Sequence, residues 1–492
     1  MFKSITPEQA GISSRHVEQF IRTLNKRGLA THSFLLMRGN DIFAECYWKP
    51  FHKDFCHRMY SQTKSYVGIA IGLLIEDGKL KLTDRICDHF PEKINEEIPG
   101  HLGMQTIQNM LTMQTCGSPP DWFAHSDPDR THLYMNENPA RHYPGMRWRY
   151  DSPGSQVLSS LVEKLAGKSL FDFLNERIFS QLGTFQTATI LKTRNGDSWG
   201  DSALLCTIRD MASFGRLLMN YGKWNDRQLI SEDYVRTATS PVVDNDTTGF
   251  TEFQSMGYGY QIWCIGEDCF FFNGMGSQLT FCFPKQDLLF TITSDNQGYP
   301  EAKGLIYAAL SDFILDNIQN DPLPEDPAAV ESLQSLGNSL ELMHLEGNKG
   351  SSYSHIINGK TYVCEENITG ITKFSLHFND DNTGEFRYTN AQGDKILYFG
   401  VGKNVFGKFP QYGYSHLRGG MENDDGYLYD CAASAAWREK HKMQLKVQII
   451  DKYFGNMIAS FCFEENRAVV SMIRTAEDFL KEYRGIFNAV LE

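Results

Sequence analysis

The sequence predicts an α+β fold: an antiparallel sheet flanked by helices and carrying an inserted helical lobe, followed by a separate all-β domain. A chain of 492 residues is long enough for roughly two to four domains. Strand-like and helical segments mix from residue 1 to about 315, whereas beyond about residue 351 apolar residues recur with a period of two. Pro322, Pro324 and Pro327 stand between these regions, so we expect a boundary there.

Residues 1–318 are expected to form the first domain. A helix begins near Ser13, and further helical spacing is found over 155–165, 171–178, 207–218 and 302–318. Strands are expected over 33–38, 41–48, 258–265, 270–272, 279–283 and 288–294. Strands on both sides of a helical block predict one sheet built from sequence-distant strands, with the helical lobe at about 80–220 packed beside it. A cleft is favoured at such a boundary.

Residues 351–492 are expected to form the all-β domain. Apolar and polar residues alternate from Phe374 to Phe378, from Met443 to Ile449 and from Met457 to Phe463. Turn sequences such as Asp381-Asn382-Thr383-Gly384 separate these runs, which fits an antiparallel barrel or sandwich. Residues 319–350 are expected to be a linker that carries one short helix.

The composition argues against several kinds of partner. There are 47 Lys and Arg against 60 Asp and Glu, so the net charge is −13 and the chain lacks the basic surface that nucleic acids bind. The best candidate for a membrane span, Val67 to Ile75, is about half the required length, and the N-terminus shows no secretory signal. We therefore expect a cytoplasmic protein without a membrane partner.

Metal ions and dinucleotide cofactors also lack sequence support. The 11 cysteines are scattered singly without a C-x-x-C pair, which indicates small core residues in a reducing compartment. The 14 histidines form neither H-E-x-x-H nor another compact cluster, and no complete G-x-G-x-x-G occurs. No metal and no cofactor are expected.

A serine and a lysine one helical turn apart are the first candidates for chemistry. Ser61 stands three residues before Lys64, at the start of a run that is apolar on nearly every side and therefore predicts a buried helix. Residues i and i+3 share a helix face, so a hydroxyl and an amine would lie side by side. Burial and the helix N-terminus both disfavour the ammonium form, which would let Lys64 accept the hydroxyl proton. By itself, however, S-x-x-K arises about once or twice by chance in such a chain, and Ser61 is then an ordinary helix cap.

Two further segments could complete a site. Tyr150 lies in the turn-rich stretch 144–154, where a phenol beside a lysine could relay protons; alternatively, it is an aromatic plug of the core. Gly274-Met275-Gly276 ends one strand before the next begins at Leu279. Glycines there would let a backbone N–H approach a substrate carbonyl and, with the N–H of Ser61, form an oxyanion hole; alternatively, they form a simple hairpin bend.

These three elements, in this order and at these separations, resemble the serine β-lactamase and penicillin-binding-protein-like family. The similarity is to the branch that contains class C β-lactamases, esterases and 6-aminohexanoate-dimer hydrolases. It extends over about residues 5–315 and includes the stretches 107–117, 208–218 and 256–263. Many such hydrolases carry a barrel-like appendage, which the C-terminal region resembles.

The resemblance implies specific roles for the candidate residues. Ser61 would be the acylated nucleophile, Lys64 its base partner and Tyr150 the proton relay in acylation and deacylation. The N–H of Ser61 and one N–H of Gly274-Met275-Gly276 would bind the oxyanion. Ser152 takes the place of the asparagine in the family's Tyr-x-Asn, so a shorter hydroxyl replaces an amide in the substrate site.

Substrate choice is expected to differ from that of the penicillin-active relatives. Those proteins carry Lys-Thr-Gly, or His in place of Lys, on the strand beside the nucleophile, whereas this strand reads Asp268 to Asn273 without a cation. We therefore expect a serine hydrolase whose partner is a small ester or amide. A β-lactamase, and a catalytically silent ligand-binding or scaffold protein on the same fold, are the alternatives. A homo-oligomer is left open.

Overall fold

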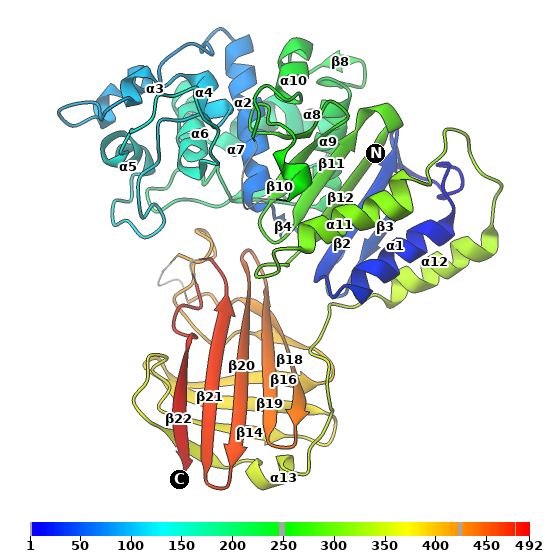
Figure 1. Cartoon of the computed structure of the whole chain (residues 1–492), viewed down its shortest axis with the longest axis vertical. Coiled ribbons are helices and arrows are strands. Elements are labelled where there is room, and N and C mark those ends of the chain that lie inside the picture. Colours follow the sequence, from blue (N-terminus) through cyan, green and yellow to red (C-terminus); the bar gives the residue numbers. More distant parts are fainter. Residues whose placement is uncertain (1, 246–250, 422–425, 478) are drawn as a thin grey trace. The chain divides into compact units, whose positions relative to one another are not determined.

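The computed structural model describes residues 2–245, 251–421, 426–477 and 479–492, which form two compact units, Met1–Glu341 and Leu342–Glu492 (Figure 1). The first unit is built on a seven-stranded sheet. Its strands lie in the order β1 (Lys3–Ser4), β3 (Asp41–Tyr47), β2 (Thr31–Arg38), β12 (Leu288–Ser294), β11 (Gln278–Phe283), β10 (Cys269–Gly274) and β9 (Trp263–Ile265). The predicted assembly from sequence-distant strands is therefore present, because β2 pairs with β12.

One strand differs from the antiparallel sheet that the sequence predicts. β1 pairs with β3 in parallel, through Lys3 with Asp41 and Ser4 with Ile42. All the other neighbours in this sheet are antiparallel. A tight turn forces an antiparallel pair, but β1 is separated from β3 by a helix and β2, so its direction is not constrained in this way.

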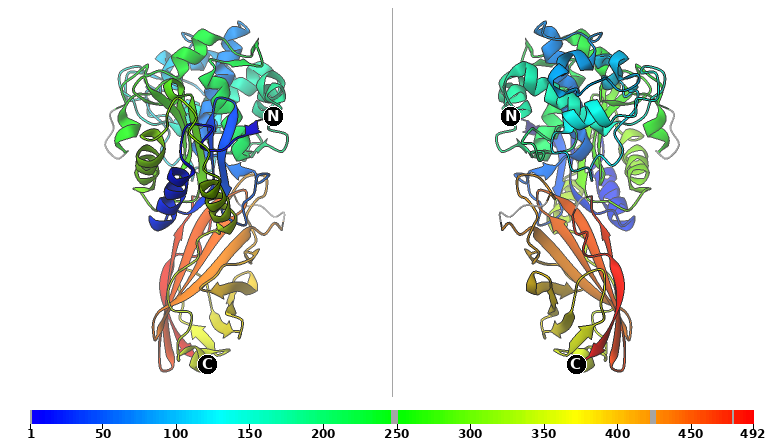
Figure 2. Two further views of the ribbon diagram at one scale, coloured as in Figure 1. Left: turned by 90° about the vertical axis from the view of Figure 1, so that its right-hand side faces the viewer. Right: turned by 90° about the vertical axis from the view of Figure 1, so that its left-hand side faces the viewer.

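Helices cover both faces of this sheet (Figures 1 and 2). The core on one face includes residues of α1 (Ser14–Lys26), α11 (Ala302–Leu310) and α12 (Pro327–Ser339), and the core on the other includes α2 (Thr63–Glu76), α6 (Ser152–Ala166) and α9 (Ile208–Met219). Strand alternation separates the two cores: Phe270 and Phe272 of β10 join the second core, whereas Phe271 joins the first.

The helix expected within the linker is α12, and it belongs to the first unit. Its Leu333 is buried in the core that contains α1, and Ser332 donates a hydrogen bond of 2.8 Å to Glu18. In the sequence this helix is only a short element flanked by prolines. No local pattern reveals what it packs against, because its packing partner, α1, is some 300 residues away along the chain. The domain limits at 318 and 351 stay predictions.

The segment between β3 and β9 contains most of the helices. Besides α2, α6 and α9, its helices are α3 (Ile86–His89), α4 (Ile107–Leu111), α5 (Arg130–Glu137), α7 (Leu170–Leu174), α8 (Ser180–Leu182) and α10 (Glu232–Ala238). Its short strands are β4 (His57–Arg58), β5 (Thr189–Ile190), β6 (Leu204–Cys206), β7 (Lys223–Trp224) and β8 (Arg227–Gln228).

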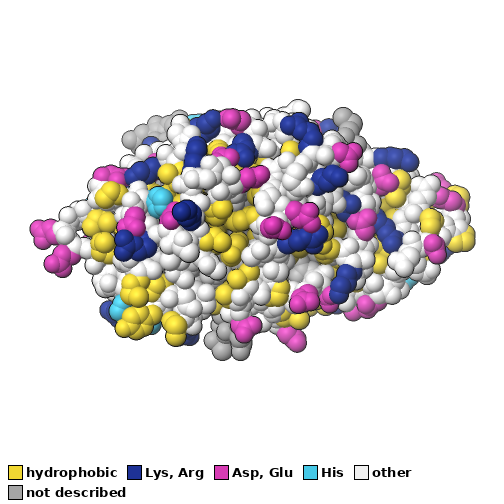
Figure 3. Space-filling model, turned by 90° about the horizontal axis from the view of Figure 1, so that it is seen from above, with side chains coloured by type: hydrophobic (Ala, Val, Ile, Leu, Met, Phe, Trp, Pro, Cys, Tyr) yellow, Lys and Arg dark blue, Asp and Glu magenta, His cyan; other side chains and the backbone are white. Residues whose placement is uncertain are grey.

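Within the described ranges, no helix has the length and apolar character needed to cross a bilayer. On the face drawn in Figure 3, acidic and basic side chains are interspersed.

The second unit is a barrel rather than a sandwich. Its elements are α13 (Ser354–Ile357), β13 (Thr361–Cys364), β14 (Lys373–Phe378), β15 (Thr383–Asn390), β16 (Gly393–Val401), β17 (Val405–Lys408), β18 (Asp430–Glu439), β19 (Lys442–Ile450), β20 (Phe454–Glu464), β21 (Arg467–Thr475) and β22 (Gly485–Leu491). In the part that the structure describes, nine strands close a ring, because β16 pairs with β18 in parallel through Gly400 and Ser434. β17 lies outside this ring, paired with β18. The alternating apolar residues fill the interior.

Candidate active site

Ser61 is presented by a strained turn at the start of a buried helix. It lies in the 3₁₀ turn Tyr60–Gln62, which leads directly into α2, and it is itself half-buried. Tyr60 has a φ of +48°, a left-handed conformation that is costly for a bulky side chain. The Arg58 guanidinium, 4.7 Å from the centroid of the Tyr60 ring, stabilises this turn and also donates a hydrogen bond of 3.0 Å to the carbonyl of Ser202.

Lys64 contacts the predicted nucleophile directly. Its Nζ donates hydrogen bonds to Oγ of Ser61 at 2.9 Å and to the backbone carbonyl of Asp201 at 2.6 Å. The Asp201 carboxylate lies 3.8 Å from the same Nζ, and both side chains are only 2% exposed. The i, i+3 geometry predicted from the sequence is therefore present, but with a buried countercharge that the sequence argument missed. No local signal marks Asp201, because it is 137 residues from Lys64.

Tyr150 completes the cluster around the ammonium group. Nζ of Lys64 lies 5.1 Å from the centroid of the Tyr150 ring. The ring stacks on Trp263, with the centroids 5.7 Å apart and the planes at 27°, and lies 6.3 Å from the Trp148 ring. Trp263 is in β9, so the sheet edge orients the phenol. The structure thus brings Ser61, Lys64 and Tyr150 together.

The residue after Tyr150 anchors this segment. Asp151 is buried and accepts hydrogen bonds from Oγ1 of Thr115 at 2.8 Å, Oγ of Ser118 at 2.7 Å and the N–H of Gly154 at 3.0 Å. Burial raises the pKa of the Asp151 carboxyl, and these bonds oppose that rise. The carboxylate caps α6, whose first residue is the predicted Ser152. An Asp directly before a helix signals such a cap, and the sequence argument read it only as the middle of Tyr-x-Ser.

The glycine segment lies against the turn that carries Ser61. β10 ends at Gly274, where a Cβ atom would lie 2.2 Å from the carbonyl oxygen of Met59. Only glycine allows this approach. Gly276 has a φ of +74°, and its carbonyl accepts a 2.9 Å hydrogen bond from Oγ of Ser294. The carbonyl of Met275 accepts one of 2.9 Å from Nε2 of Gln278. The segment is thus held rigidly next to the candidate nucleophile.

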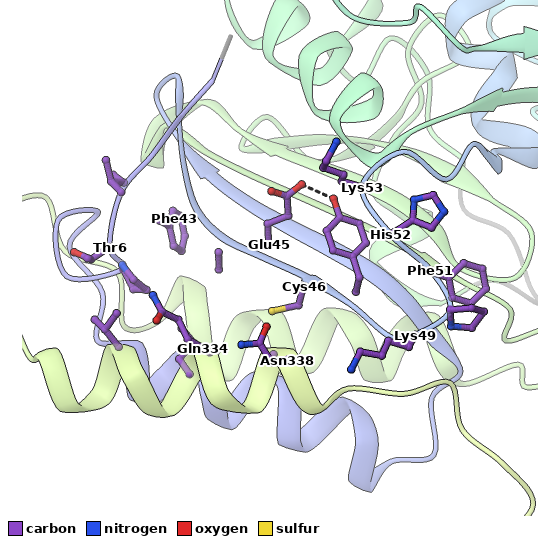
Figure 4. A pocket seen from close by; sticks show the side chains of 18 residues that line it. Thr6, Phe43, Glu45, Cys46, Lys49, Phe51, His52, Lys53, Gln334 and Asn338 are labelled. Atoms are coloured by element: carbon purple, nitrogen blue, oxygen red, sulfur yellow. Dashed lines mark hydrogen bonds between the residues drawn. The ribbon is translucent and has the colours of Figure 1, made fainter. Parts of the chain in front are cut away.

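Two pockets of the first unit differ in their relation to this cluster. One of about 320 Å³ is lined by Met275 and Gly276 and by Lys303 of α11. A larger one of about 1010 Å³ lies between β3 and α12, where Cys46, Gln334 and Asn338 line it (Figure 4). None of Ser61, Lys64 and Tyr150 lines either pocket, but the smaller one is bordered by part of the segment expected to bind the oxyanion.

Similarity to known proteins covers much of the first unit. The sequence pattern of the family described as Beta-lactamase matches residues 17–312, more than half of the chain. The chain belongs to the beta-lactamase family. Among beta-lactamase relatives, a 6-aminohexanoate-dimer hydrolase of Paenarthrobacter ureafaciens is 25% identical over 263 residues, which cover 50% of this chain and 67% of that protein. Penicillin-binding protein 4* of Bacillus subtilis is 26% identical over 194 residues, covering 35% of this chain and 41% of its own length.

Solved structures of the beta-lactamase type show the same fold. A Bacillus anthracis protein, provisionally named a 6-aminohexanoate-dimer hydrolase, matches with a TM-score of 0.52 and 21% identity, covering 64% of this chain and 86% of that chain. A Bacteroides dorei protein, provisionally named a β-lactamase, has a TM-score of 0.52 and 14% identity, covering 62% and 99% of the two chains. The predicted β-lactamase/transpeptidase-like fold is confirmed, together with the closed C-terminal barrel.

Proposed function

We propose that this protein is a serine hydrolase that cleaves a small ester or amide through an acyl-enzyme. The observation that carries the proposal is the 2.9 Å hydrogen bond between Nζ of Lys64 and Oγ of Ser61. A hydroxyl held by a buried lysine, beside a tyrosine and at a helix N-terminus, is suited to nucleophilic attack. Membership of the beta-lactamase family supports the same chemistry.

The proposed reaction has two steps. Oγ of Ser61 attacks the substrate carbonyl while Tyr150, beside the positive charge of Lys64, takes up its proton and passes it to the leaving group, whose bond to the carbonyl carbon breaks. The oxyanion is held by backbone N–H groups of Ser61 and of the segment 274–276, with Ser152 contacting the substrate beside it. Water then attacks the acyl-enzyme through the same proton relay, which releases the acid and restores the Ser61 hydroxyl.

The first test combines covalent labelling with turnover. Purified wild type is incubated with a fluorophosphonate probe and its intact mass is measured, and release of p-nitrophenol from short acyl esters is followed. Ser61→Ala should abolish labelling and lower turnover by at least about 1000-fold, since the nucleophile is removed. Ser160→Ala, on the partly exposed side of α6, is the matched control and should leave both unchanged. Wild type that neither labels nor turns over would contradict the proposal.

A β-lactamase is the second candidate, favoured by the beta-lactamase family itself. It predicts that a chromogenic cephalosporin is hydrolysed and that the acyl group leaves Ser61 rapidly. The esterase or amidase proposal predicts that the acyl group of the cephalosporin is released from Ser61 slowly or not at all. A catalytically silent scaffold predicts that Ser61→Ala leaves ligand affinity nearly unchanged and that the wild type has no turnover to lose. The small-molecule partner, a homo-oligomer and the cytoplasmic location stay predictions.

A further inference from the structure

The outer edge of β3 is only partly covered by other backbone. At one end β1 pairs with β3 as far as Ile42. A turn begins at Pro7, which has no N–H to donate, so β1 cannot continue along the edge. At the other end Lys49 pairs in parallel with Glu341, two residues after α12 ends. Between these ends, the stretch 43–48 has no strand beside it on the outer side in the part of the chain that the structure describes.

Backbone hydrogen-bonding groups face this open stretch. The N–H of Trp48 donates a hydrogen bond of 2.9 Å to the carbonyl of His32, which lies in β2. Successive residues of a strand point their N–H and C=O groups to alternate sides, so Cys46 also faces β2, whereas Glu45 and Tyr47 present theirs to the outer edge. Neither of these two finds a backbone partner there among the described residues. An unpaired strand edge is a template on which another strand can form.

A groove of about 1010 Å³ lies along this open edge, between β3 and α12 (Figure 4). Its walls carry apolar side chains from both elements, Val330 and Leu333 from α12 and Phe43 and Ala44 from β3. The six open residues of β3 correspond to about 20 Å of extended chain. A segment of that length would bury the side chains of one of its faces against α12.

The groove carries a surplus of positive charge. Lys49 and Lys53 line it, and Glu45 is the one acidic residue among its described lining residues. The guanidinium of Arg209 neutralises Glu45 through hydrogen bonds of 2.8 and 2.6 Å. Lys53 is paired with Asp54, whereas Lys49 forms no ion pair within the described part of the chain. An acidic group on the occupant would therefore be complementary to Lys49.

We propose that the open edge of β3 binds an extended segment of another protein as an added strand, with apolar side chains against α12 and an acidic residue at the Lys49 end. The backbone of β3 supplies the hydrogen bonds, the wall of α12 selects apolar residues at alternate positions, and Lys49 sets the position of the acid. A compact small molecule would leave the row of N–H and C=O groups unpaired. The inference is independent of the proposed hydrolase, because neither Ser61 nor Tyr150 lines the groove.

The probes are two fluorescein-labelled peptides, Thr-Val-Thr-Val-Thr-Glu and Glu-Thr-Val-Thr-Val-Thr, which place the acid at either end so that both strand directions are covered. At least one should bind the wild type with a Kd of about 10–100 µM, measured by fluorescence anisotropy. N-methylation of alternate residues removes either the N–H groups that face β3 or those that face away from it. Methylation of one alternating set should therefore lower the affinity by at least about 10-fold, and methylation of the other by less than about 2-fold.

Variants of the groove test where the peptide binds. Asn338 lines the groove and is exposed, so Asn338→Trp should fill part of the space and lower the peptide affinity by at least about 10-fold. Ser335→Trp makes the same change at an exposed residue of α12 that does not line the groove, and it should bind as the wild type does.

Charge reversal tests the acidic end of the peptide. Lys49→Glu should weaken binding of the Glu-containing peptide and strengthen binding of a peptide with Lys in place of Glu. Lys81→Glu, at an exposed residue of the helical lobe, is the matched control and should change neither affinity. Circular dichroism establishes that each variant is folded.

Two kinds of result would overturn the proposal. If neither peptide binds the wild type with a Kd below about 1 mM, the edge does not accept a strand. If a peptide binds but the two methylated sets lower its affinity equally, or the two tryptophan variants do, it is not held as a strand on β3. Ser61 labelling should be the same in all four variants, so failure of this proposal leaves the hydrolase proposal in place.

Discussion

At the residue scale, the candidate site depends on a buried lysine whose charge is balanced. Nζ of Lys64 has the carboxylate of Asp201 at 3.8 Å and the hydroxyl of Ser61 at 2.9 Å. The S-x-x-K spacing was enough to predict the contact between Ser61 and Lys64, because i and i+3 share a helix face. It could not reveal Asp201. This residue comes shortly before β6, and it reaches the site because β6 pairs with β4, the strand that precedes α2.

Removing this countercharge should impair both stability and chemistry. Asp201→Asn keeps the backbone carbonyl and the side-chain shape but leaves Lys64 buried without a carboxylate. We expect a loss of about 3 kcal/mol in the free energy of unfolding, because breaking one side of a buried pair strands the other charge. The rate of Ser61 labelling by a fluorophosphonate should fall by at least about 10-fold, measured where the variant is fully folded.

Asp226→Asn serves as the control, since that side chain is fully exposed. It should change the free energy of unfolding by no more than about 0.5 kcal/mol. Equal labelling rates in wild type and Asp201→Asn would show that the carboxylate has no part in the chemistry.

At the element scale, the end of β10 positions the proposed oxyanion segment. The sequence predicted a strand that ends in glycines, and the structure adds the reason for Gly274: the carbonyl of Met59 lies where its Cβ would be. Such a contact joins two elements that are more than 200 residues apart, so no local pattern could reveal it. The same holds for α12, which appeared as a linker helix until α1 was seen to cover it.

A single methyl group at the end of β10 should therefore disturb the site. Gly274→Ala places a Cβ 2.2 Å from the carbonyl oxygen of Met59, so the strand end or the Ser61 turn must move. We expect a destabilisation of about 1–3 kcal/mol from the overlap, and a loss of turnover of at least about 10-fold. Chemical denaturation and p-nitrophenyl ester kinetics measure the two effects.

The matched control is another strand glycine with open space around it. A Cβ at Gly407 in β17 meets nothing within 4 Å, so Gly407→Ala should leave turnover unchanged. If Gly274→Ala is as active as Gly407→Ala, the close approach has no role in the site.

At the scale of the whole molecule, the chain divides into two units with separate cores. The change from mixed periodicity to period two predicted this division. Whether the second unit is a barrel or a sandwich was left open, because alternation shows only that one face of each strand is buried. The parallel pairing of β16 with β18 decides for the barrel.

Separate cores lead to a prediction about where a core mutation acts. Phe461 in β20 is fully buried in the barrel, and Phe461→Ala should destabilise the second unit by about 3–5 kcal/mol, because it leaves a cavity. Ser61 labelling should be unchanged even at a temperature where the variant barrel has unfolded, because the first unit has cores of its own. Calorimetry and the labelling assay test the two halves of this prediction.

Ile473→Ala removes an apolar side chain that is 62% exposed on the neighbouring strand β21. It should shift the barrel transition by no more than about 0.5 kcal/mol. Loss of Ser61 labelling in Phe461→Ala would mean that the two units unfold as one.

Local pattern was sufficient for most of the longer helices, the main strands of the first sheet, the two-part organisation and the Ser61, Lys64, Tyr150 and glycine motifs, because these depend on periodicity and on short spacings along the chain. Tertiary structure alone placed Asp201 beside Lys64, Lys303 beside Asn273 and β16 beside β18. The residues of the strand before the glycine segment, Asp268 to Asn273, predicted that no cation would be present, and Lys303 of α11 supplies one from another element. Charges and strand edges act through space, so their partners are set by how the chain folds back on itself and not by their position along it.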